Sequence, residues 1–109
     1  MMTEQDIIKR CKEICANVNQ DFTIPVKINK RLTKTLGRVN YIIDRRGKIH
    51  SVSMEFSYQL LNTATFDSID QVIKHECAHY LVNEITQEKH GHDTVYKNKV
   101  DPTTTNLVQ

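Results

Sequence analysis

The chain has 109 residues, a net charge of +2 and 39% hydrophobic residues, which fits one globular domain with a modest core. No apolar run approaches the ~20 residues that a membrane-spanning helix needs, so we expect no membrane partner. Three cysteines, an odd number, do not make a disulfide framework, and residues 1–6 are polar rather than signal-like. The expected location is therefore the reducing cytoplasm.

The first half of the chain predicts one helix and three strands. Residues 3–19 carry apolar side chains at steps of three and four, which is typical of an amphipathic helix. A strand is predicted over 26–30, and a hairpin over 38–43 and 49–54 with Gly47 in its turn. Alternation along the last strand predicts that three side chains share one face: His50, Val52 and Met54.

The second half predicts a short helical turn over 57–62 and then one long helix. Ser68 followed by Gln71 matches a capping box, so the long helix should begin there and run to residue 85 or 88. The expected fold is α+β, with an N-terminal helix, a small antiparallel sheet of about three strands, and the long helix packed on that sheet. We expect residues 1–109 to form a single domain, with 101–109 as a loosely ordered tail.

The long predicted helix contains His75-Glu76-Cys77-Ala78-His79, which has the pattern H-E-x-x-H. Residues four apart lie about 40° apart around a helix, so the two imidazoles project side by side and can bind one zinc ion. Glu76 lies on the adjoining stripe, where its carboxylate can accept a proton from a water that zinc has made more acidic. The alternative is a chance match of surface side chains, but the position inside a strong helix pattern favours a metal site.

A catalytic zinc ion usually has three protein ligands, so the motif needs one more. The candidates follow the helix in Lys89-His90-Gly91-His92-Asp93. Gly91 allows the chain to turn back toward the helix, which favours His92 over its neighbour His90. Asp93 can either orient His92 or compete with it as a ligand.

The basic residues are unevenly distributed along the chain. Eight of them lie between residues 27 and 48, where Asp44 is the one acid. This asymmetry is typical of a face that binds nucleic acid, but lysines also protect sheet edges from aggregation, and both interpretations stay open. The candidate nucleic-acid-binding residues are Lys27, Lys30, Arg31, Lys34, Arg38, Arg45, Arg46 and Lys48.

Residues 75–81 (His-Glu-Cys-Ala-His-Tyr-Leu) and 91–96 (Gly-His-Asp-Thr-Val-Tyr) resemble the SprT-like, or Spartan-like, zinc metallopeptidase domains. The upstream order of elements also resembles that family. The chain departs from the family pattern G-H-G-x-x-F at two positions, with Asp93 in place of Gly and Tyr96 in place of Phe. The resemblance implies one zinc ion (Zn²⁺) per chain, Glu76 as general base, and three metal ligands: His75, His79 and His92.

The expected function is therefore that of a zinc-dependent endopeptidase of SprT-like type, acting on a protein or peptide. The resemblance suggests DNA-associated proteins as substrates, with DNA itself as a candidate partner of the basic segment. The alternative is a zinc-stabilised nucleic-acid-binding or adaptor domain with little or no turnover, which has no need of Glu76. The candidates for stabilising an oxyanion are Tyr58, Tyr80 and Tyr96.

Overall fold

The computed structural model describes residues 1–86, and every structural statement below concerns that part of the chain. The predictions that fall on His90, His92, Asp93 and Tyr96, and on the tail 101–109, lie outside the described residues. The described elements are three helices and three strands, and none of these helices is long and apolar enough to cross a membrane.

The first helix, α1 (Glu4–Ala16), begins at a capping box, in which Thr3 and Asp6 exchange side-chain and backbone hydrogen bonds. It ends three residues before the predicted residue 19, and Val18 is 52% exposed rather than part of the apolar stripe. The reason is local: Asn19 has a φ of 57°, a left-handed conformation that asparagine tolerates and that stops a helix.

The sheet contains β1 (Val26–Asn29), β2 (Gly37–Ile43) and β3 (Ile49–Ser57), in the order β1-β3-β2. The predicted hairpin is confirmed, because β2 and β3 pair antiparallel. The sheet is nevertheless mixed rather than antiparallel, since β1 pairs with β3 in parallel. β3 is the central strand, and its buried Met54 lies opposite the buried Val26 of β1. The chain between β1 and β2 must therefore cross from one edge of the sheet to the other.

A β-bulge interrupts the hairpin and corrects one sequence prediction. Asn40 pairs with Ser53 and Tyr41 with Ser51, so Val52 is an extra residue in β3. An inserted residue changes the alternation of side chains between the two faces of a sheet. The prediction that Val52 shares a face with Met54 is therefore wrong: Val52 is 42% exposed, whereas Met54 is fully buried.

Two helices follow the sheet, α2 (Tyr58–Thr63) and α3 (Phe66–Thr86). The predicted helical turn is confirmed as α2, which Ser57 caps by accepting a hydrogen bond from the backbone of Leu60. The predicted cap of α3 at Ser68 is wrong by three residues. The hydroxyl of Thr65 accepts from the backbone nitrogen of Ser68 at 3.1 Å, so Thr65 provides the cap and Ser68 lies in the first turn.

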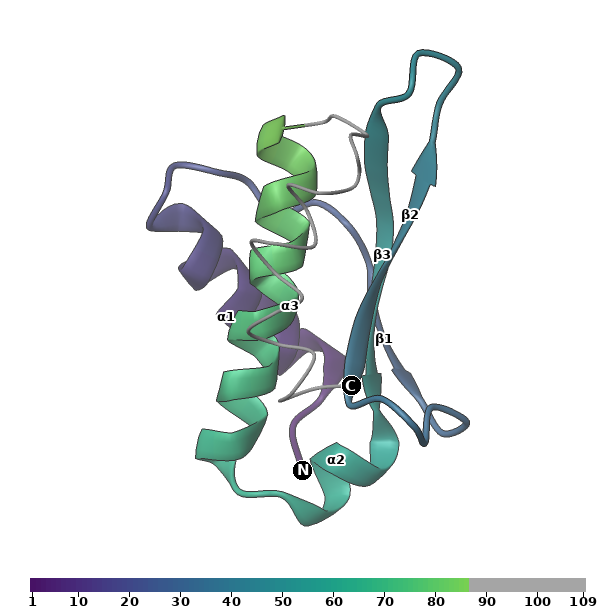
Figure 1. The fold of residues 1–109 in the computed structure, drawn as a ribbon. Coiled ribbons are helices and arrows are strands. Elements are labelled where there is room, and N and C mark those ends of the chain that lie inside the picture. Colours follow the sequence, from purple (N-terminus) through teal and green to yellow (C-terminus); the bar gives the residue numbers. More distant parts are fainter. Residues whose placement is uncertain (87–109) are drawn as a thin grey trace.

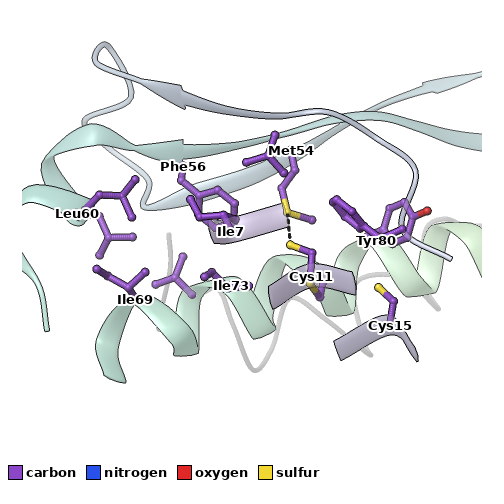
Figure 2. Close-up of a cluster of buried hydrophobic side chains, with 14 residues drawn as sticks. Ile7, Cys11, Cys15, Met54, Phe56, Leu60, Ile69, Ile73 and Tyr80 are labelled. Carbon is purple, nitrogen blue, oxygen red and sulfur yellow. Dashed lines mark hydrogen bonds between the residues drawn. The ribbon is translucent and has the colours of Figure 1, made fainter. Parts of the chain in front are cut away.

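The helices α1 and α3 lie on the same side of the sheet and enclose the core (Figure 1). Apolar side chains from both helices and from β3 meet there, as Figure 2 shows for Ile7, Met54, Phe56, Ile73 and Tyr80. A bidentate ion pair also joins the helices: the guanidinium of Arg10 donates to both carboxylate oxygens of Asp70, at 2.7 and 3.1 Å. The α+β architecture predicted from the sequence is thus confirmed.

Candidate metal centre

The two motif histidines meet on one flank of α3. Helical geometry brings His75 and His79 one turn apart, and their Nε2 atoms lie 3.1 Å from each other. The rings are 4.8 Å apart between centroids and stand nearly edge to face, at 74°. Both residues are buried, with 7% and 6% of their surfaces exposed.

This arrangement fits a shared zinc ion. A tetrahedral zinc with Zn–N distances near 2.0–2.1 Å places two ligand nitrogens about 3.3 Å apart, within a few tenths of an ångström of the distance found. Burial also lowers the pKa of His79 to about 4, so its imidazole is neutral at physiological pH. A neutral imidazole is the form that binds metal ions.

Glu76 lies beside His75 and meets the sheet at Gly37 of β2. Its side chain is almost fully buried, with 1% of the residue exposed, and its Oε2 is 3.9 Å from Nε2 of His75. Burial raises the pKa of Glu76 from 4.5 to about 8, because the charged carboxylate loses its contact with water. A carboxyl group with a pKa near neutrality can exchange protons at physiological pH.

A comparison with protein families matches residues 4–106 to the SprT-like family. The chain belongs to the SprT-like family. No curated protein and no solved structure matches it. The family match spans nearly the whole chain, including the H-E-x-x-H helix and the segment 91–96 that carried the resemblance in the sequence.

The predicted third ligand lies outside the described residues. Within residues 1–86, no group of three or more His, Cys, Asp or Glu side chains is arranged to hold a metal ion. His90, His92 and Asp93, the candidates from the sequence, all follow that range. His50 has a different partner, since its Nε2 lies 2.8 Å from a carboxylate oxygen of Asp44.

The remaining motif residue, Cys77, faces away from the two histidines. It interacts with the thiols of Cys11 and Cys15 of α1, and all three thiols are buried. The Cys11 thiol and burial raise the pKa of Cys77, and burial and the Cys77 thiol raise the pKa of Cys15 to about 12, so both sulfurs stay protonated. Figure 2 also shows the thiol of Cys11 pointing to the sulfur of Met54, 3.9 Å away. The metal site therefore faces away from α1.

Tyr80 has a structural role rather than one in the site. Its hydroxyl donates to the backbone oxygen of Asp21 at 2.9 Å and accepts from the backbone nitrogen of Thr23 at 3.4 Å. Its ring packs against Phe22 with centroids 5.0 Å apart. Of the three tyrosines considered for the oxyanion, Tyr80 is thus excluded by its contacts.

Sequence reasoning missed two residues near the site. Asn83 continues the stripe of His75 and His79 by another four residues, is fully buried, and donates to the hydroxyl of Ser51 at 3.1 Å. The four-residue spacing was a readable signal for it. Gly37 approaches Glu76 from β2, and no local pattern signals that contact because it joins distant parts of the chain.

Seven of the eight basic candidates form two clusters rather than one patch, and Arg38 lies between them in β2. One cluster lies in and near the β1–β2 connection and the other at the tip of the β2–β3 hairpin, at opposite ends of β2 (Figure 1). Among the described residues, Arg38 is the one member in an ion pair, with Glu55 at 3.2 Å. The connection cluster is Lys27, Lys30, Arg31 and Lys34, and the tip cluster is Arg45, Arg46 and Lys48.

Proposed function

We propose that this SprT-like chain is a zinc-dependent endopeptidase in which His75, His79 and His92 hold the metal ion and Glu76 is the general base. The observation that carries the proposal is the pair of Nε2 atoms 3.1 Å apart beside a buried carboxyl group. A purely structural zinc site needs no such carboxyl group, and its burial costs free energy when it is charged.

The residues divide the chemistry between them. Zinc, when bound, supplies a Lewis acid that polarises a carbonyl and acidifies a water molecule. The pKa of Glu76 falls beside a bound cation, which leaves its carboxylate ionised and ready to accept a proton from the attacking water. Glu76 then delivers this proton to the leaving amine. His79 stays neutral, and His75 and His79 fix the position of the metal.

The fold supports a polypeptide as the substrate. The helix α1 packs against β1, and α3 packs against β2 and β3. Because Cys77 faces α1, the histidines lie on the opposite flank of α3, and Glu76, 3.9 Å from His75, reaches β2 at Gly37. The strand order makes β2 an edge strand among the described elements. An extended polypeptide can pair with such an edge, which would carry its peptide bonds past the site.

The proposal is tested with Glu76→Gln, an amide of the same shape that cannot accept the proton. The assay follows cleavage of an unfolded protein, and self-cleavage, by zinc-loaded chain. We expect a 10²- to 10⁴-fold loss of turnover with unchanged zinc content. Glu84→Gln on the same helix is the matched control and should cleave like the wild type. Cleavage that survives Glu76→Gln undiminished rules out this base, and a zinc-loaded wild type without cleavage favours the adaptor alternative.

A second proposal is that the basic segment binds nucleic acid. Its support is the exposure of the two clusters and their lack of ion pairs among the described residues, which leaves their charges available to phosphates. Reversing three charges of either cluster to Glu should weaken binding to a DNA duplex and reduce its salt dependence. The reversal of Lys9 and Lys12 on α1 is the control. Binding that is absent at low salt, or insensitive to salt, contradicts the proposal.

A further inference from the structure

Gly37 opens β2 directly against the side chain of Glu76. It pairs with Phe56 of β3 and is buried. A Cβ atom placed on Gly37 would lie 3.0 Å from Cγ of Glu76 and 3.3 Å from its Oε2. Both distances are shorter than ordinary van der Waals contact, so the backbone of β2 is in close contact with the buried carboxyl side chain.

The backbone conformation does not explain why this residue is glycine. Among the described glycines, Gly47 at the hairpin tip is the one with a positive φ, of 82°. Gly37 therefore has a conformation that other residues adopt readily. A glycine inside a strand is unfavourable on its own, because it loses more conformational entropy and packs no side chain. The close approach to Glu76 is what requires the missing side chain.

The strand has little room to move away from Glu76. The same Cβ would also lie 3.3 Å from the backbone oxygen of Glu55 in β3. The pairing that holds β2 there includes a hydrogen bond from the backbone nitrogen of Ser57 to the oxygen of Leu36, at 2.9 Å. A side chain at position 37 must therefore displace Glu76 rather than the sheet.

We propose that Gly37 is a positioning residue, whose bare backbone fixes the side chain of Glu76 in the orientation from which it serves the metal site. This inference rests on the proposed function, because it concerns the orientation of the proposed base. It also identifies the start of β2 as the part of the sheet that closes one side of Glu76 to water. A methyl group at position 37 then turns the carboxyl group away while the histidine ligands keep their places.

The contact itself is tested by a double-mutant cycle of Gly37→Ala and Glu76→Ala, followed by urea unfolding of chelated protein. Gly37→Ala should lower the urea midpoint when Glu76 is present. It should lower the midpoint much less in the Glu76→Ala background, because the crowding atoms of Glu76 are gone and only the 3.3 Å approach to the backbone oxygen of Glu55 remains. Gly47→Ala is the control, since its positive φ makes it destabilising in both backgrounds. Equal effects of Gly37→Ala in both backgrounds overturn the inference.

The positioning role is tested by the kinetics of zinc-loaded Gly37→Ala. We expect at least a tenfold loss of kcat with unchanged KM and zinc content, whereas Gly47→Ala keeps the wild-type kcat. A folded, zinc-loaded Gly37→Ala with wild-type kcat overturns the positioning role. If the wild type itself does not cleave, the proposed function fails. The cycle then decides alone: coupling supports Gly37 as the residue that fixes Glu76, and no coupling overturns it.

Discussion

The metal-free wild type should lose stability as the pH rises above 6.5. Replacing Glu76 by Gln should abolish this loss. The folded state holds the proton on Glu76 with a pKa of about 8, raised from 4.5 by burial. The unfolded state releases it at the ordinary value. A raised folded-state pKa gives stability that is complete below the unfolded pKa and is lost as the pH approaches the folded one.

The magnitude follows from the two shifts at the site. One pKa unit corresponds to about 1.36 kcal/mol, so Glu76 alone removes about 5 kcal/mol between pH 4.5 and 8. His79 acts in the opposite direction, because burial lowers its pKa from 6.5 to about 4 and its contribution is lost as the pH falls. The two effects largely cancel between pH 4.5 and 6.5. From pH 6.5 to 8 the effect of Glu76 remains, about 2 kcal/mol.

The assay is urea unfolding of chelated wild type and Glu76→Gln at pH 6.5 and pH 8. With a slope of about 2 kcal/mol per molar urea, the wild-type midpoint should fall by about 1 M over this interval, while that of the variant stays constant. Any constant cost of burying the Gln amide cancels, since each protein is compared with itself. Parallel curves for the two proteins would show that the carboxyl group is solvated and that its burial in the structure is wrong.

Three further outcomes are expected. His75→Ala should lose bound zinc as measured by atomic absorption, and His92→Ala should lose far more than His90→Ala; the reverse order would assign the third ligand to His90. Tyr80→Phe should lower the free energy of unfolding by about 1 kcal/mol through the lost hydrogen bond and leave zinc content and cleavage unchanged, so a specific loss of turnover would contradict its structural role. Arg10→Ala should lower the free energy of unfolding in urea by about 1 kcal/mol and no more, because its ion pair with Asp70 of α3 is partly exposed and screened by water. The same loss in a background that lacks the Asp70 carboxylate would show that the ion pair does not cause it.

The elements that were predictable are those whose signals are local. Apolar spacing located α1 and α3, and the turn around Gly47 located the hairpin. The parallel pairing of β1 was not predictable, since four residues with one buried face look the same in a parallel or an antiparallel ladder. The bulge at Val52 was hidden for a related reason: an alternating pattern continues in the sequence even where the register shifts.

The residues of the candidate site also differ in whether the sequence could predict their placement. His75, Glu76 and His79 lie within one helix, where spacing alone fixes their mutual placement, and the structure has them side by side. The contact of Gly37 with Glu76 depends on the packing of β2 against α3, which no spacing in the sequence encodes. The role of His92 stays a prediction, because that residue follows the described range.

The order of the elements also sets when the site can form. The helix that carries the motif is the last described element, and its ion pair to α1 joins residues 60 positions apart. During synthesis, α1 and the sheet therefore emerge first, with the apolar surfaces that α3 will cover still exposed to solvent. Such distant contacts form slowly, because the chain between them must close before they stabilise anything. The histidines and Glu76 acquire their burial only when α3 docks, so a nascent chain without α3 lacks the candidate metal site.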